Sequence, residues 1–190
     1  MDFQEIYIEL ENAVGENNLL KIAEIFANHP DLNLNDKSLY RLNPPLCRAA
    51  KAGYYEMCKF LIQHGADVNY TKDRLFSPLW AASSGNHLEI VKLFIANGAD
   101  INAYEKSTTS ALNEAAAKGH FEIVRYLIQK GADINRLTTT LLYSPLDWSI
   151  AYERNEISVF LKEHGALSNI RHDYVWLETG GGISQHIDWN

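Results

Sequence analysis

The chain has 190 residues with a formal net charge of −7, and 46% of its residues are hydrophobic and 22% charged. This length and composition are typical of one globular or solenoid domain. The acidic balance disfavours binding to a nucleic-acid backbone, which needs a basic stripe. The sequence has no run of about 20 apolar residues, so we expect no membrane span, and its acidic start predicts no signal peptide.

One five-residue phrase recurs along the chain at a fixed interval. It reads GADVN at 65–69, GADIN at 98–102 and GADIN again at 131–135, so that successive copies start 33 residues apart. A fixed period of this length indicates a solenoid of similar supersecondary units. Solenoids present extended curved surfaces, which favours a binding function over a catalytic one.

The first expected unit, residues 3–35, is degenerate. Leu10, Ala13 and Leu20 keep the apolar register of the later units, but His29–Asn33 replaces the repeated phrase. Such a departure is expected of an end unit, because it faces water on one side.

The following four units are expected at 36–70, 71–103, 104–136 and 137–168, and each reads as two short helices. A proline in the first turn, a preceding serine N-cap and paired alanines predict the first helix. An acidic residue begins the second helix, whose apolar residues recur at helical spacing until a glycine ends it. The pattern is carried by the anchor leucines Leu46, Leu79, Leu112 and Leu146, the prolines Pro45, Pro78 and Pro145, the serines Ser77, Ser110 and Ser144, and the glycines Gly65, Gly98, Gly131 and Gly165.

The turn between the two helices of a unit needs a left-handed residue, which glycine and asparagine tolerate. Gly53, Asn86 and Gly119 meet this need, whereas Glu153 occupies the same place in the last unit. We therefore expect a distorted or tightened turn at Glu153. The last two anchor leucines are 34 residues apart instead of 33, so this unit also carries one inserted residue.

These patterns closely resemble the ankyrin repeat family. The matching residues are Ser-Pro-Leu at 77–79 and 144–146, the group Ala115, Ala116, Gly119 and His120, and the three Gly-Ala-Asp-x-Asn phrases, and the resemblance covers residues 3–167. It implies an all-α solenoid of stacked antiparallel helix pairs with projecting hairpin loops. Family members typically bind proteins through the hairpin tips and the inner helix face. The chain departs from the family directly after the anchor leucines, where Cys47, Trp80, Asn113 and Asp147 replace a frequent histidine.

The resemblance places candidate partner-binding residues at the hairpin tips and on the inner helices. The aromatic residues and arginines among them are the strongest candidates, because these residue types dominate interface energetics. Alternatively, the tip residues are ordinary surface residues or pack within the row of hairpins. Trp148 is expected in the core, whereas Trp80 suits either the core or the concave face. The candidate residues are Tyr40, Arg41, Asn43, Asp73, Arg74, Phe76, Trp80, Lys106, Asn113, Tyr143, Asp147 and Tyr152, and the inner-helix residues Lys51, Ser84 and Lys118 are also expected to be exposed.

Residues 169–190 depart from the repeat and are expected to form a C-terminal cap or extension. Their aromatic residues, which include Tyr174, Trp176 and Trp189, are too many for a disordered tail. We expect this tail to cover the apolar face of the last unit, or alternatively to add to the partner site. Gly180–Gly182 lacks the lysine of a phosphate loop, and the neighbouring histidines and aspartates match no metal-ligand spacing.

No pairing of a nucleophile with a base stands out, so we expect a non-catalytic protein–protein interaction module without cofactor or metal. The acidic charge suits a basic protein partner, although the same charge also serves solubility. The specific hypothesis is a monomeric inhibitor, such as an immunity protein that occludes a basic toxin. The alternatives are an adaptor or host-directed effector scaffold, and a small-ligand receptor or enzyme that uses the tail.

Cys47 and Cys58 are the only cysteines. They lack a C-x-x-C pattern and fit buried thiols in a reducing compartment, which predicts a cytoplasmic location. The family resemblance also implies that Asn69 and Asn135, each with a leucine eight residues earlier, are substrates of an asparaginyl hydroxylase. The alternative is that these asparagines close their loops by hydrogen bonding to the backbone.

Overall fold

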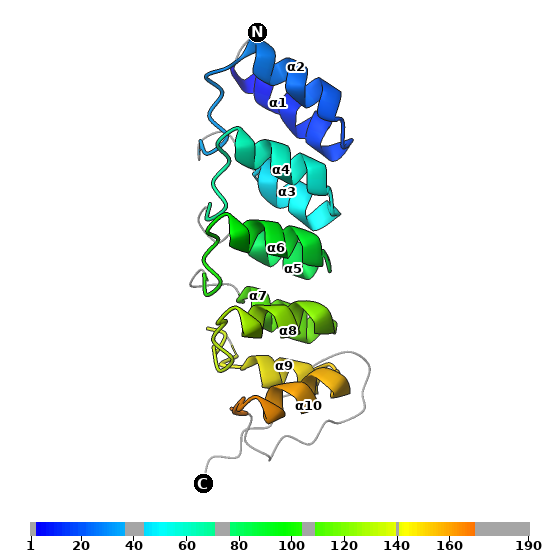
Figure 1. Cartoon of the computed structure of the whole chain (residues 1–190), viewed down its shortest axis with the longest axis vertical. Helices are drawn as coiled ribbons and strands as arrows, with labels where there is room; N and C mark the ends of the chain where they lie inside the picture. The colour runs from blue at the N-terminus through cyan, green and yellow to red at the C-terminus, as the bar shows by residue number, and fades with distance from the viewer. Residues whose placement is uncertain (1–2, 37–43, 71–76, 104–108, 140, 170–190) are drawn as a thin grey trace.

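The computed structural model describes residues 3–36, 44–70, 77–103, 109–139 and 141–169. These residues form ten helices and no strand. Figure 1 shows the helices as five antiparallel pairs stacked along one axis, with the first and last pairs at opposite ends. The fold is therefore an all-α solenoid, as the 33-residue period predicts.

Each repeat contributes one helix to an inner row and one to an outer row. Neighbouring inner helices contact each other along the whole stack, and so do the outer helices from α4 to α10. The inner row consists of α1 (Phe3–Gly15), α3 (Pro45–Ala52), α5 (Pro78–Ser84), α7 (Ala111–Lys118) and α9 (Pro145–Ala151). The outer row consists of α2 (Leu19–Asn28), α4 (Tyr55–Gln63), α6 (Leu88–Ala96), α8 (Phe121–Gln129) and α10 (Asn155–Glu163).

The inner helices begin where the serines and prolines predict. The hydroxyl Oγ of Ser77 accepts a hydrogen bond from the backbone N–H of Trp80 at 3.1 Å, and Ser110 caps α7 in the same way. Ser144 forms a capping box, because the Asp147 carboxylate in turn accepts from the Ser144 backbone N–H. These bonds satisfy backbone donors that the first helical turn leaves unpaired.

The turn between the two helices is left-handed in all five repeats. The residue seven positions after each anchor leucine has a positive φ even where it is not glycine, and the first repeat follows the same register. These residues are Asn17 (φ 54°), Gly53 (83°), Asn86 (62°), Gly119 (83°) and Glu153 (57°).

The turn at Glu153 is tightened and not distorted. The backbone N–H of Arg154 donates to the carbonyl of Ser149 at 2.7 Å, and the equivalent bond from His120 to Ala115 measures 2.9 Å. The same hydrogen bond therefore holds the turn with and without glycine. Glutamate tolerates a conformation that costs a side-chain-bearing residue about 1–2 kcal/mol, because the helices on both sides determine the path of the backbone.

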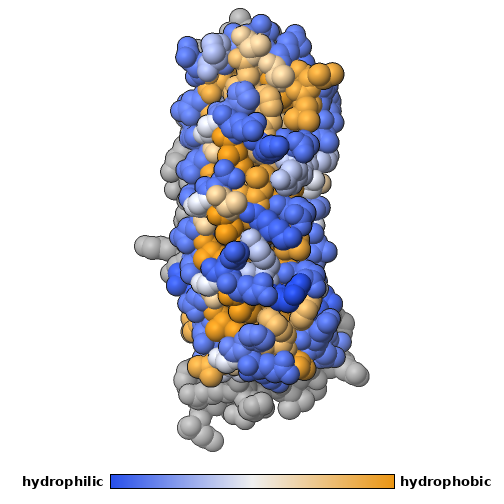
Figure 2. All heavy atoms as spheres, viewed as in Figure 1, coloured by the Kyte–Doolittle hydropathy of each residue, from blue (hydrophilic) through white to orange (hydrophobic). Residues whose placement is uncertain are grey.

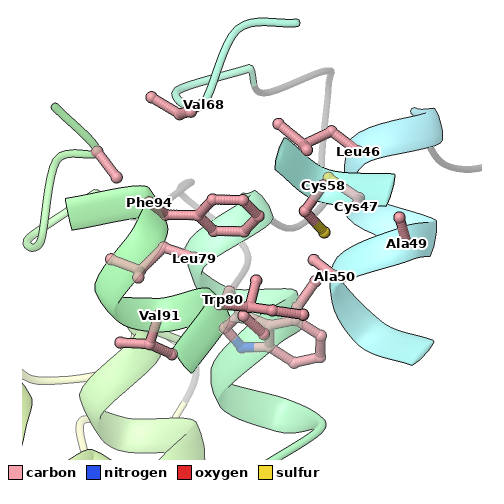
Figure 3. Close-up of a cluster of buried hydrophobic side chains, with 14 of the residues drawn as sticks. Leu46, Cys47, Ala49, Ala50, Cys58, Val68, Leu79, Trp80, Val91 and Phe94 are labelled. Carbon is pink, nitrogen blue, oxygen red and sulfur yellow. The ribbon is translucent and has the colours of Figure 1, made fainter. Parts of the chain in front are cut away.

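The core runs continuously through the stack. The five anchor leucines, from Leu10 to Leu146, are at most 3% exposed, and the adjoining alanines allow the inner helices to approach closely. Figure 3 shows one section of this core, where Phe94, Leu79 and Trp80 point toward the preceding repeat. Cys47 and Cys58 lie there as buried thiols, and burial raises the pKa of Cys58 to about 12.

A ladder of asparagine side chains joins consecutive repeats at the end of each outer helix. The Asn69 amide Nδ2 donates to the Gly98 carbonyl at 2.9 Å, and its Oδ1 accepts from the Asp100 N–H at 2.7 Å. Asn35 and Asn102 make the same two bonds to the repeats that follow them. The alternative of loop-closing asparagines thus matches the observed bonding.

The first repeat ends later than its sequence register predicts. Asn35, not Asn33, joins the ladder, and the Asn33 side chain accepts from the Asn35 N–H at 2.9 Å, as Asp67 does for Asn69. The segment Asn33–Asn35 therefore takes the structural role that we assigned to Asp31–Asn33. Two extra residues after α2 move this role, and a sequence register alone does not locate such an insertion.

Candidate functional site

The inner row carries a groove across helices α5, α7 and α9, with a volume of about 520 Å³. We call it the inner groove. Its residues come from three consecutive repeats: Ser84 and Gly85 at the end of α5, Glu114 and Lys118 on α7, and Trp148 and Tyr152 on α9.

No helix in the described part of the chain has the length and apolarity needed to cross a membrane.

A change in side-chain size along the inner row produces this groove. Six positions after the anchor leucine the repeats carry Ala52, Gly85, Lys118 and Tyr152, so small residues give way to long ones. Gly85 also lies close to α3, because a Cβ added there would stand 2.6 Å from the Lys51 carbonyl oxygen. The small side chains of α5 therefore leave a hollow that the longer side chains of α7 and α9 border.

A polar network fixes one wall of the inner groove. The Ser84 hydroxyl donates to the Glu114 carboxylate at 3.0 Å, and Lys118 Nζ lies 2.8 Å from the same hydroxyl. Lys118 also pairs with Glu114 at 3.3 Å. Because the lysine and glutamate charges balance, this wall is polar without being strongly charged.

Two side chains bridge consecutive repeats beside this network. His120 Nε2 lies 3.4 Å from the Ser84 carbonyl, and Arg154 Nε donates to the Ala117 carbonyl at 3.1 Å. Burial lowers the pKa of His120, and the positive charges of Lys118 and Arg154 act in the same direction. The neutral imidazole is therefore favoured, with Nε2 as the donor to the carbonyl.

Aromatic rings form the opposite wall. Trp148 and Tyr152 stack with their ring centroids 5.7 Å apart, and Tyr143 meets Trp148 edge to face at 5.3 Å. The Tyr152 side chain is 50% exposed. Trp148 Nε1 is buried and has no hydrogen-bond partner among the described residues. Aromatic rings of this kind, rigid and partly desolvated, are typical anchors of protein interfaces.

Most of the hairpin-tip candidates lie outside the described residues. They stay predictions, and their placement relative to the inner groove is open. This group comprises Tyr40, Arg41, Asn43, Asp73, Arg74, Phe76 and Lys106. Of the remaining candidates, Tyr143 and Tyr152 lie together at the aromatic wall.

Three candidates are buried, and one of them, Asn113, also lines the inner groove. Trp80 is 8% exposed, and its Nε1 donates to the Thr109 hydroxyl at 2.9 Å. Asn113 is 1% exposed, and its amide donates to two backbone carbonyls of the next loop. The fully buried Asp147 caps α9. These polar groups hold helices and loops in place, and their contact with a partner stays a prediction.

Ser84 and Trp148 do not have the exposure that their sequence positions predict. Ser84 was expected to be exposed and is 6% exposed, because α7 covers it. Trp148, expected in the core, is half-buried at the edge of the inner groove. Glu114 and Arg154 were not among the candidates. An alignment of the repeats would find them, because Glu114 occupies the repeat position of Trp148 and Arg154 occupies that of His120.

The stacked helix pairs, with a groove on the inner row, make the chain an all-α solenoid, a class of protein that presents extended surfaces for binding. A family model described as ankyrin repeats (3 copies) matches residues 10–105 and 79–172. The chain therefore belongs to the ankyrin repeat family, and its repeats form a protein–protein interaction module. No curated protein matches the chain.

Proposed function

We propose that this chain binds a folded protein partner across the inner groove and the predicted hairpin tips, and that it inhibits the partner by covering its surface. The observation that carries the proposal is the half-exposed Tyr152 ring stacked on Trp148 beside a polar, charge-balanced wall. A surface with a rigid aromatic anchor and a polar rim is the usual composition of an interface centre.

The chemistry of the inner groove indicates what the partner presents. An apolar or aromatic side chain would pack on the exposed face of Tyr152. A carbonyl that reached Trp148 Nε1 would satisfy a buried donor whose isolation costs about 1–3 kcal/mol. Arg154 stands at the rim and pairs with no carboxylate of the described residues, so a partner carboxylate would also fit there.

The acidic charge of the chain lies mostly away from the inner groove. Exposed glutamates begin the outer helices, and exposed aspartates occupy the phrases that end each repeat. A basic partner would therefore be attracted by the overall field, which increases the rate of association, while the inner groove supplies neutral contacts. These acids are Glu56, Glu89, Glu122 and Glu156, and Asp67, Asp100 and Asp133.

An adaptor is the second candidate function, because the opposite end of the stack also exposes apolar surface. Leu20 is 86% exposed and Ile8 is 58% exposed on the first repeat. Figure 2 shows an apolar area at this end of the molecule, and further apolar areas follow along the middle of the same face. Simultaneous occupation of both ends would distinguish an adaptor from an inhibitor of the immunity type. The cytoplasmic location and monomeric state belong to the same proposal.

The proposal is tested by purifying the tagged, intact chain from its source cell and identifying co-purified proteins by mass spectrometry. Tyr152→Ala removes the exposed anchor and is expected to weaken partner binding by about tenfold or more, as removal of an interface anchor does. Tyr55→Ala is the matched control, because Tyr55 is 39% exposed on the outer helix α4. Arg74→Ala with Phe76→Ala tests the hairpin tips separately.

One near-stoichiometric partner that is lost with Tyr152→Ala and retained with Tyr55→Ala would support the inner groove as the site. Inhibition is then measured as the loss of the partner's own activity on titration with the chain. Retention of the partner by Tyr152→Ala would contradict the inner groove, and loss only in the tip variant would transfer the site to the hairpins. Several substoichiometric partners would favour the adaptor.

A further inference from the structure

We propose that the C-terminal tail closes the stack by packing its apolar run Tyr174–Leu177 on the end of helix α9, around Ile150. Ile150 is 40% exposed. The equivalent residues of the three preceding repeats, Ala50, Ser83 and Ala116, are fully buried, because the next inner helix covers each of them. The last inner helix thus exposes an apolar side chain at a position that the fold elsewhere covers.

The size of Ile150 indicates what kind of cover fits. Three of the four preceding repeats carry alanine or serine at this position, and the first carries Val14, which is fully buried under the next inner helix. Isoleucine is larger than all of these side chains, so a further inner helix would stand farther from α9. A sixth repeat, or the first repeat of a second copy stacked in the same register, would therefore pack less closely on α9 than the inner helices pack elsewhere. A single irregular segment can adapt to the larger side chain.

The outer helix of the last repeat needs no such cover. Lys162 replaces the isoleucines that stand at this position in α4, α6 and α8, and it is exposed. Ser158 stands where the preceding repeats carry cysteine or valine, and its hydroxyl bonds to that of Ser149 at 2.8 Å. At the open end of the stack, α10 thus presents polar side chains and α9 presents an apolar one. One short segment is enough to cover the α9 side.

At the end of the last repeat, residues 168 and 169 lie beside the N-terminus of α9. The Asp147 carboxylate accepts from the Ser168 hydroxyl at 2.6 Å and from the Asn169 backbone N–H at 3.0 Å. The Asn169 side chain donates to the Leu142 carbonyl at 2.8 Å, and Leu142 is itself 54% exposed. These bonds fix the starting point of the tail beside the N-terminus of α9.

The tail has the length and composition for this role. Residues 170–190 follow the attachment point, and the run Tyr-Val-Trp-Leu begins five positions after Asn169. Helix α9 has seven residues, so it is about 10 Å long, whereas five extended residues reach about 17 Å. The run can therefore reach Ile150, and it offers three apolar or aromatic side chains besides the tyrosine to bury there.

Hydrogen exchange of the full chain, read by mass spectrometry, tests this proposal. We expect peptides that contain Tyr174–Leu177 to exchange at least about tenfold more slowly than an unstructured peptide. Ile150→Asp should remove this protection. The matched control is Val159→Asp, because Val159 is 56% exposed in the same repeat but occupies an outer position that preceding repeats fill with lysine or arginine.

Trp176→Asp provides a second test from the other side of the contact. It should abolish the protection and leave the exchange of helices α1 to α8 unchanged. Free exchange of the run in the natural chain, or equal protection in Ile150→Asp, would overturn the proposal. Light scattering distinguishes another occupant. If protection rises with protein concentration and the mass doubles, a second copy covers α9 and the proposal fails.

Discussion

His120 shows at the residue scale how a neutral side chain can serve as a link between repeats. Its Nε2 faces the Ser84 carbonyl at 3.4 Å, next to the cationic groups of Lys118 and Arg154. A protonated imidazole would be a third positive charge in this partly desolvated place.

We predict that stability falls on acidification partly because of His120. Burial lowers the pKa of His120 in the folded chain, whereas the unfolded chain has a histidine pKa of about 6.5. As the pH falls below about 6.5, the unfolded state binds the proton first, so the free energy of unfolding decreases. Urea titrations at pH 7.5 and 5.5 should show a smaller decrease for His120→Gln than for the natural chain.

His87→Gln is the control for this comparison, because His87 bridges to the Lys51 carbonyl at the equivalent position of the preceding repeat. It should retain the additional decrease that the natural chain shows. If the natural chain and His120→Gln lose equal stability between the two pH values, His120 is not the titrating group.

At the scale of the element, the asparagine ladder couples repeats whose helices are too short to be stable alone. The inner helices α3, α5, α7 and α9 have seven or eight residues, and isolated helices below about 12 residues are marginal in water. Contacts between repeats therefore provide most of the stability, and each ladder asparagine adds two hydrogen bonds to these contacts.

We predict that Asn69→Ala lowers the free energy of unfolding by about 1–3 kcal/mol, because two bonds to the next repeat are lost and each contributes about 0.5–1.5 kcal/mol. Asn97→Ala is the control. The Asn97 amide bonds only to Leu93 of its own helix among the described residues, so we expect a change of about 0.5 kcal/mol. Urea unfolding followed by circular dichroism measures both. Equal losses would show that the ladder does not couple repeats.

At the scale of the whole molecule, stability is distributed along one dimension. Each helix pair contacts only its neighbours in the stack, so an end repeat has one interface and a central repeat has two. End repeats should therefore open at a lower free energy than central ones. In Figure 1, the pairs α1–α2 and α9–α10 stand at the two ends of the stack.

We predict that two equally buried leucines respond differently to substitution. Leu112 in the central α7 and Leu146 in the terminal α9 are 1% and 2% exposed, and each change to alanine should remove about 2–5 kcal/mol of local stability. Leu146→Ala should release α9 and α10 alone, whereas Leu112→Ala should destabilise both of its neighbours. Hydrogen exchange resolved by peptide measures this, and uniform loss across the stack in both variants would contradict the one-dimensional description.

The sequence by itself determined the repeat, the starts of the inner helices and the burial of the anchor leucines. Proline, serine and glycine act on the backbone within one or two turns, so their spacing predicts helix starts and ends without knowledge of the neighbouring repeats. The anchor leucines are buried because each occupies the same position of its repeat. Even the degenerate first repeat shows its register through Asn17, which adopts the left-handed turn.

Only the tertiary structure decided which side chains of the inner row remain accessible. Asn113 and Asp147 follow anchor leucines in the sequence, yet loops and caps bury them. Tyr152 stays half-exposed, because Gly85 and the other small side chains of α5 leave space beside it. Exposure depends on the side chains of two adjacent repeats at once, and a pattern within one repeat does not contain that information.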